Sequence, residues 1–85
     1  MSKTLMIFSS PNCAPCGPTK EAAQNADLGG AELRIVDVEE HPEIAMRHGA
    51  RSLPTLIVTD ASGDPLAQHV GALSQSGIEA LVARA

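Results

Sequence analysis

The stretch from residue 5 to residue 9 reads Leu-Met-Ile-Phe-Ser, an apolar run of strand length that ends in a serine. A strand with one face in water alternates apolar and polar residues, and this run does not alternate. The pattern therefore predicts a strand that is buried on both faces, in the middle of a covered sheet. A chain with such a strand has to supply covering elements on both sides of the sheet.

The rest of the chain divides into short elements that are separated by glycine, proline and aspartate. Residues 13–26 favour a helix, with prolines in its first turns and a glycine pair after its end. A second helix opens at residues 41–43 and stops at Gly49, and a third follows Ser74 as its N-cap. The predicted strands after the first are residues 32–38, 53–59 and 65–70, with a hairpin turn at residues 60–64.

This order predicts the topology of the sheet. A strand–helix–strand unit at the front requires a parallel pair with a right-handed crossover, whereas the short turn near the end requires an antiparallel hairpin. We therefore predict an α/β fold of the order βαβαββα, with a four-stranded mixed sheet and helices on both faces. Because the chain has only 85 residues, residues 1–85 should form a single domain.

Composition excludes several classes of function. The net charge is -4 and Phe8 is the one aromatic residue, so the chain lacks the positive charge and stacking rings that nucleic-acid binding uses. No apolar run approaches the ~18 residues of a membrane span. The apolar stretch at the N-terminus is too short for a secretory signal. We expect a soluble, cytoplasmic monomer.

The two cysteines, Cys13 and Cys16, form a C-x-x-C motif. Such a pair can be a redox centre, an inert local disulfide or part of a metal site. So short a disulfide ring contributes little to stability. Structural zinc needs four ligands, and the three histidines His41, His48 and His69 are scattered without ligand spacing. We therefore favour the redox pair and predict neither a metal nor another cofactor.

The position of the pair indicates which sulfur does what. The motif follows a buried strand and opens a helix, where unpaired N–H groups and the helix dipole favour negative charge. A thiolate there is stabilised relative to a free cysteine, whose pKa is about 8.5. We predict that Cys13 lies at the exposed cap and attacks, and that Cys16, one turn inside, resolves the mixed disulfide. Pro15 restricts the loop between them.

Four segments resemble, in the same order, motifs of the thioredoxin-like superfamily. Residues 10–16 (SPNCAPC) look like its active-site loop, and residues 37–43 (DVEEHPE) look like its D-V-D-x-N-P-E stretch. Residues 49–56 (GARSLPTL) look like G-V-R-S-I-P-T-L, and residues 70–74 match V-G-A-L-S. The chain is thus similar to small thioredoxins and glutaredoxin-like proteins over most of its length. The resemblance implies a thioredoxin-like fold and a thiol–disulfide oxidoreductase that reduces protein disulfides.

The resemblance also implies a substrate-binding surface. The bond from Leu53 to Pro54 should be cis and lie beside the cysteines, and the backbone of Leu53 should pair with an extended substrate segment. Ala14 and Pro15 should contact substrate from the active-site loop. Gly71 should leave room for a partner's backbone, because it has no side chain. A trans proline on an edge strand and a plain turn glycine are the alternatives for Pro54 and Gly71.

Three positions depart from the thioredoxin pattern. Asn12 replaces the usual tryptophan before the first cysteine. Ile7 stands where thioredoxins carry a buried aspartate that takes the proton of the resolving thiol, and Ile35 stands where a lysine partners that aspartate. We therefore expect Cys16 to lose its proton to solvent or to the departing thiolate, and resolution to be slow at neutral pH.

The glutaredoxin pattern is also incomplete, because no basic residue precedes Cys13 closely and residues 71–74 read Gly-Ala-Leu-Ser instead of Gly-Gly-x-Asp. Because no charged side chain is placed to bind the carboxylates of glutathione, a thioredoxin reductase is the better candidate for reducing the cysteine pair. A glutathione-coupled glutaredoxin stays open, as do a soft-metal (zinc or copper) carrier and an interaction module with incidental cysteines. Soft-metal carriers have the order strand, helix, strand, strand, helix, strand, which the final helix here does not fit.

Overall fold

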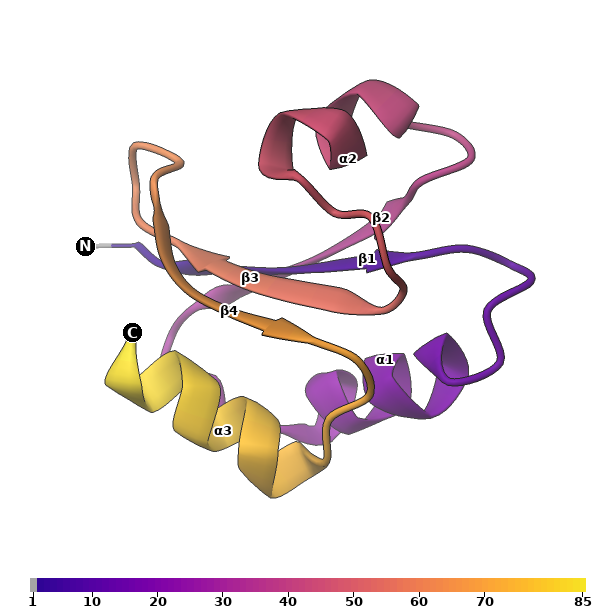
Figure 1. Ribbon diagram of the computed structural model, residues 1–85. Coiled ribbons are helices and arrows are strands. Elements are labelled where there is room, and N and C mark those ends of the chain that lie inside the picture. The colour runs from indigo at the N-terminus through magenta and orange to yellow at the C-terminus, as the bar shows by residue number, and fades with distance from the viewer. Residues whose placement is uncertain (1) are drawn as a thin grey trace.

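The computed structural model describes residues 2–85. Within them the chain forms strands and helices in the predicted order (Figure 1). No helix in this described part is long and apolar enough to cross a membrane. The elements are β1 (Thr4–Ser9), α1 (Cys16–Asn25), β2 (Glu32–Asp37), α2 (Pro42–His48), β3 (Thr55–Thr59), β4 (Pro65–Val70) and α3 (Gln75–Arg84).

The strands form one four-stranded mixed sheet in the order β2-β1-β3-β4. β1 runs parallel to β2 and antiparallel to β3, and β4 is antiparallel to β3 at the other edge. In this register Ile7 lies between Ile35 on β2 and Leu56 on β3. The predicted parallel pair at the front and hairpin near the end are both confirmed.

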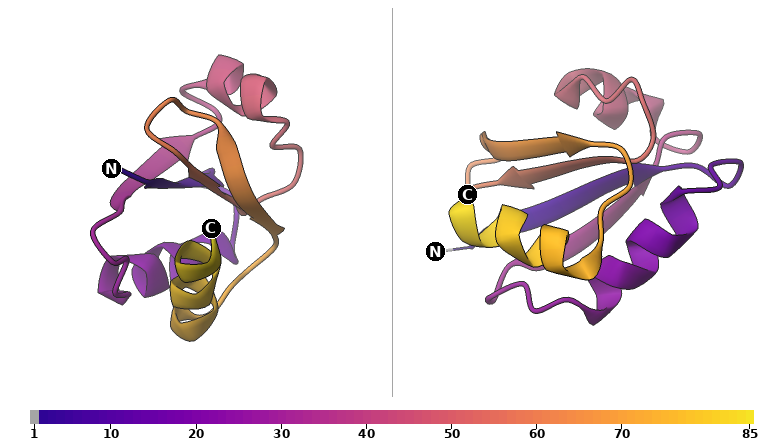
Figure 2. Two further views of the ribbon diagram at one scale, coloured as in Figure 1. Left: turned by 90° about the vertical axis from the view of Figure 1, so that its left-hand side faces the viewer. Right: turned by 60° about the horizontal axis from the view of Figure 1, so that its bottom comes forward.

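β1 is buried on both faces, as the apolar run predicts. Leu5 and Ile7 pack in one cluster with side chains of α1 and α3, whereas Met6 and Phe8 pack in a second cluster with α2. Figure 2 shows the resulting layers, with α1 and α3 side by side below the sheet and α2 above it. The alternating directions of successive strand side chains thus divide one continuous apolar run between two cores.

α3 shows the predicted cap and apolar face. The Ser74 hydroxyl oxygen accepts a hydrogen bond from the backbone N–H of Gly77 at 3.2 Å, which satisfies one of the free donors of the first turn. Ile78, Leu81 and Val82 are buried against the sheet. Their spacing places them on one side of the helix, so α3 closes the core that β1 opens.

The starts of α1 and β3 lie later in the chain than predicted. α1 begins at Cys16 with Pro15 as its N-cap, not at Cys13, and ends at Asn25. A helix that began at Cys13 would place Pro18 beyond the first turn, where its missing N–H would remove an intrahelical bond. β3 begins at Thr55, because Pro54 directly before it has no N–H for the sheet ladder.

The packing of α3 predicts a stability difference between two leucines. Leu81 is 1% exposed and Leu66 on β4 is 43% exposed. We expect Leu81→Ala to lower the free energy of unfolding by about 2–5 kcal/mol. The matched Leu66→Ala should lower it by less than about 1 kcal/mol, because little buried surface is lost. Urea unfolding followed by far-ultraviolet circular dichroism measures both, and equal losses would contradict the assigned core.

Candidate active site

The C-terminal ends of β1, β2 and β4 and the N-terminal end of β3 lie at the same end of the sheet. The register pairs Ser9 with Asp37, Phe8 with Thr55, and Thr55 with Val70. The loops that leave β1, β2 and β4 and the segment that enters β3 therefore lie next to one another, on the right in Figure 1. These connections contain the four segments whose sequences resemble motifs of the thioredoxin-like superfamily.

Cys13 and Cys16 are joined by a disulfide with their Cα atoms 5.4 Å apart. Cys16 is the first residue of α1 and is 1% exposed, whereas Cys13 is only half-buried. Cys13 itself lies in the turn two residues before the N-cap, so the prediction that it forms the cap is wrong. Its sulfur lies beside the start of the helix because it is bonded to Cys16. The two sulfurs therefore differ in access, with Cys13 the one that a partner can reach.

Hydrogen bonds fix the loop around the pair. The N–H of Cys13 donates to the Ser10 carbonyl and the N–H of Cys16 donates to the Cys13 carbonyl, both at 3.2 Å. The Thr19 hydroxyl donates to the Pro15 carbonyl at 3.0 Å. Ala14 and Pro15 are exposed beside the disulfide. The loop thus presents an apolar surface next to the more accessible sulfur.

Pro54 and Gly71, far apart in the sequence, are brought together. The Leu53–Pro54 peptide bond is cis, Pro54 is buried, and Leu53 is half-buried. The N–H of Gly71 donates to the Pro54 carbonyl at 2.8 Å. Gly71 has a φ of 104°, a conformation that side-chain-bearing residues rarely adopt. This hydrogen bond extends the pairing of β3 with β4 toward the end of the sheet at which the cysteine loop lies.

The two positions at which thioredoxins would carry a charge are occupied by isoleucines in this chain. Ile7 is 0% exposed and packs in the cluster beneath α1 and α3. Ile35 pairs with it in register on β2 and is partly exposed to solvent. At these two positions there is thus no carboxylate or amine that could exchange a proton with the buried Cys16.

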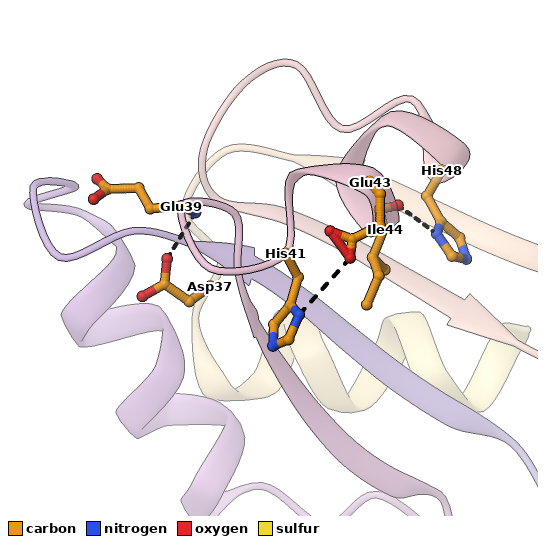
Figure 3. Close-up of polar contacts among 6 residues, drawn as sticks. All are labelled: Asp37, Glu39, His41, Glu43, Ile44 and His48. Atoms are coloured by element: carbon orange, nitrogen blue, oxygen red, sulfur yellow. Dashed lines mark hydrogen bonds and ion pairs between the residues drawn. The ribbon is translucent and has the colours of Figure 1, made fainter.

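A contact between Asn12 and Glu39 was not predicted from the sequence. The Asn12 side-chain amide donates to a carboxylate oxygen of Glu39 at 3.3 Å. The backbone N–H of Glu39 donates in turn to the Asp37 carboxylate at 2.8 Å (Figure 3). The sequence identifies Asn12 only as a departure from the tryptophan of thioredoxins. No sequence signal links two exposed side chains 27 positions apart, so only the fold reveals this bond.

The three histidines serve separate local contacts. His41 lies 3.9 Å from the Glu43 carboxylate, and the ring nitrogen Nδ1 of His48 lies 2.9 Å from the carbonyl oxygen of Ile44 (Figure 3). His69 lies on β4, with Nε2 3.3 Å from a carbonyl oxygen of the loop that follows. Within residues 2–85 no group of three or more histidine, cysteine, aspartate or glutamate side chains could hold a metal ion.

The mixed sheet, its helices on both faces and the disulfide at the start of α1 define a thioredoxin-like fold with a dithiol centre. The family model for thioredoxin matches residues 1–84, and the chain belongs to the thioredoxin family. It is therefore a thiol–disulfide oxidoreductase with the C-x-x-C pair of a protein-disulfide reductase.

Individual relatives agree with this assignment. The chain is 35% identical to a thioredoxin from Chlorobaculum thiosulfatiphilum over 77 residues, which cover 87% of this chain and 70% of the relative. It is 28% identical to the SPbeta prophage-derived thioredoxin-like protein YosR of Bacillus subtilis, over 79% of this chain and 80% of that protein. The structure of the germline-specific thioredoxin Deadhead from Drosophila melanogaster has a similar fold, with a TM-score of 0.84 at 22% identity, covering 98% of this chain and 80% of that one.

A pair of glycines tests the role of the loop after β4. Gly71 and Gly63 both have positive φ values, 104° and 88°, and an added Cβ would meet no atom within 4 Å at either position. Gly63 lies in the β3–β4 turn, at the opposite end of the sheet. We expect Gly71→Ala and Gly63→Ala each to lower the free energy of unfolding by about 1–2 kcal/mol, because both need a left-handed backbone.

Only Gly71→Ala should also slow dithiothreitol-driven insulin reduction several-fold at a temperature where both variants are folded, because its methyl group would occupy space that a bound substrate backbone needs. Equal activity of the two variants would show that Gly71 serves the turn alone.

Proposed function

We propose that the chain reduces disulfides of other proteins, with Cys13 as the attacking thiolate and Cys16 as the resolving thiol. The observation that supports these roles is the difference in access between the two sulfurs, since Cys13 is half-buried and Cys16 is almost completely buried. A substrate sulfur can approach Cys13 from solvent, whereas Cys16 can react only with a sulfur that is already bonded beside it.

The reaction then proceeds in two exchanges. The Cys13 thiolate attacks one sulfur of the substrate disulfide, a Cys13–substrate bond forms, and the other substrate sulfur leaves as a thiolate. The Cys16 thiol gives its proton to solvent or to the departing thiolate and attacks the Cys13 sulfur. The Cys13–substrate bond breaks and the second substrate sulfur leaves. Two electrons pass to the substrate, and the chain ends with the Cys13–Cys16 disulfide that the structure contains.

We further propose that an extended substrate segment binds along the edge formed by Leu53, Pro54 and Gly71. The backbone of Leu53 precedes β3 and is free to pair with such a segment, as in other cases of strand addition. The exposed Ala14 and Pro15 would contact the residues that flank the substrate disulfide. This arrangement recognises backbone more than side chains and suits a broad set of protein substrates.

A thioredoxin reductase is the proposed source of electrons. Glutathione carries two carboxylates, which proteins usually bind with arginine or lysine. The segment from Ser9 to Cys13 has no basic residue, and the loop that follows β4 has none. We propose that the protein is a monomer in the cytoplasm, where cellular reductants keep dithiols in the reduced form.

Single cysteine variants test the assigned roles. Cys13→Ser should abolish dithiothreitol-driven insulin reduction, because it removes the attacking sulfur. Cys16→Ser should instead accumulate a stable mixed disulfide with substrate, visible by non-reducing electrophoresis and mass spectrometry. Trapping by Cys13→Ser but not by Cys16→Ser would reverse the assignment.

The apolar environment at Ile7 predicts the pH dependence of the second exchange. With no acid or base at this buried position, and with a leaving group too weakly basic to take the proton, Cys16 must lose its proton to solvent. The rate of resolution should then rise about tenfold per pH unit while the thiol is mostly protonated, in proportion to its thiolate fraction. Stopped-flow release of thionitrobenzoate from its mixed disulfide with Cys13 measures this step. A second inflection near neutral pH, from a group that is not a cysteine, would show that another residue takes the proton.

A further inference from the structure

The carboxylate of Glu39 lies at the rim of the redox centre. Glu39 is exposed in the loop between β2 and α2, and it accepts a hydrogen bond from the side chain of Asn12 at 3.3 Å. Asn12 directly precedes Cys13. The carboxylate of Glu39 is therefore hydrogen-bonded to the residue directly before Cys13, the more accessible of the two cysteines.

The backbone around Glu39 is held in place. The N–H of Glu39 donates to the Asp37 carboxylate at 2.8 Å, and the N–H of Val38 donates to the Ser9 carbonyl at 2.9 Å. In Figure 3 the Glu39 side chain extends toward the loop that follows β1, whereas Glu43 points to His41. The carboxylate is thus presented to the active-site loop by a fixed turn.

The charge of Glu39 is not neutralised within the described part of the chain. The ion pair found among residues 2–85 joins His41 to Glu43 at 3.9 Å and does not include Glu39. An amide donor orients a carboxylate but adds no positive charge. The whole chain carries a net charge of -4, so no overall positive field offsets the carboxylate.

We propose that Glu39, held by Asn12, is a specificity-determining residue that favours disulfides flanked by basic residues and disfavours anionic ones, including glutathione disulfide. This inference rests on the proposed function of the cysteine pair. Two unit charges about 8 Å apart change a rate by about two- to sixfold when water lies between them and the effective dielectric constant is about 40 to 80. Asn12 is the positioning residue, because it holds the carboxylate toward the side on which substrate reaches Cys13.

Two synthetic peptide disulfides, identical except for lysines or glutamates beside the disulfide, provide the test. The measured quantity is the ratio of kcat/KM for the lysine peptide to that for the glutamate peptide. Because both values come from the same variant, the ratio cancels any change in the intrinsic reactivity of Cys13. Arg51, which is exposed in the segment before Pro54, carries the opposite charge. It is present in every variant and therefore does not contribute to the differences between their ratios.

We expect Glu39→Gln to lower this ratio by about 4- to 36-fold at low ionic strength, because the lysine peptide loses an attraction and the glutamate peptide loses a repulsion of about two- to sixfold each, while glutamine keeps the hydrogen-bond acceptor. The difference from the unaltered chain should disappear near 1 M salt, where the Debye length is about 3 Å. Glu43→Gln is the matched control. It removes the same charge from the neighbouring helix turn and should leave the ratio unchanged.

Asn12→Ala should lower the ratio by a smaller factor, because the charge remains but is no longer held toward Cys13. An unchanged ratio in Glu39→Gln, or an equal fall in Glu43→Gln, would overturn the role of Glu39. An unchanged ratio in Asn12→Ala would overturn the positioning role. If the unaltered chain reduces neither peptide nor insulin, the proposed function itself fails, a result distinct from an active enzyme without charge preference.

Discussion

The burial of β1 on both faces is the constraint on which the rest of the structure depends. Its side chains from residue 5 to residue 9 are all buried, so each face must be covered, by α1 and α3 on one side and by α2 on the other. β1 also has a neighbouring strand on each side. The loop that follows it is therefore flanked by the loop after β2 and the segment before β3. A central strand thus produces a central reactive loop.

Much of this arrangement could be predicted because it depends on local patterns. The apolar run gave the position of β1, the spacing of Ile78, Leu81 and Val82 gave the buried face of α3, and Ser74 gave its cap. The order of the elements gave the mixed sheet and excluded the topology of soft-metal carriers. The cysteine pair was recognised because its two residues are close in sequence.

The parts that could not be predicted depend on competition or on distance along the chain. The predicted start of α1 is wrong because helix-favouring residues compete with two prolines. The helix begins at Cys16, which leaves Pro18 in the first turn, where its missing N–H costs no intrahelical bond. The bond between Gly71 and Pro54 joins two loop backbones, which leaves no trace in side-chain patterns. The contact of Asn12 with Glu39 likewise depends on how two loops approach each other.

Together these features place charge at the surface of the redox centre and not behind it. Ile7 is an apolar residue of the buried core, while Glu39 carries a carboxylate that is exposed to solvent. In this chain a buried charge at the position of Ile7 therefore cannot assist the second exchange, and surface charge is left to influence which partners approach. In the proposed mechanism, the departures from the family pattern at residues 7 and 12 affect different steps.

The two ends of the chain lie together on the side away from this chemistry. The Lys3 side-chain amine donates to the Ala85 carbonyl, and Figure 1 shows both ends opposite the loop that carries the cysteines. A tether, an affinity tag or a fused domain attached through either end would therefore leave the exchanging sulfurs unobstructed. The same geometry suits immobilisation on a solid support with the reactive edge facing outward.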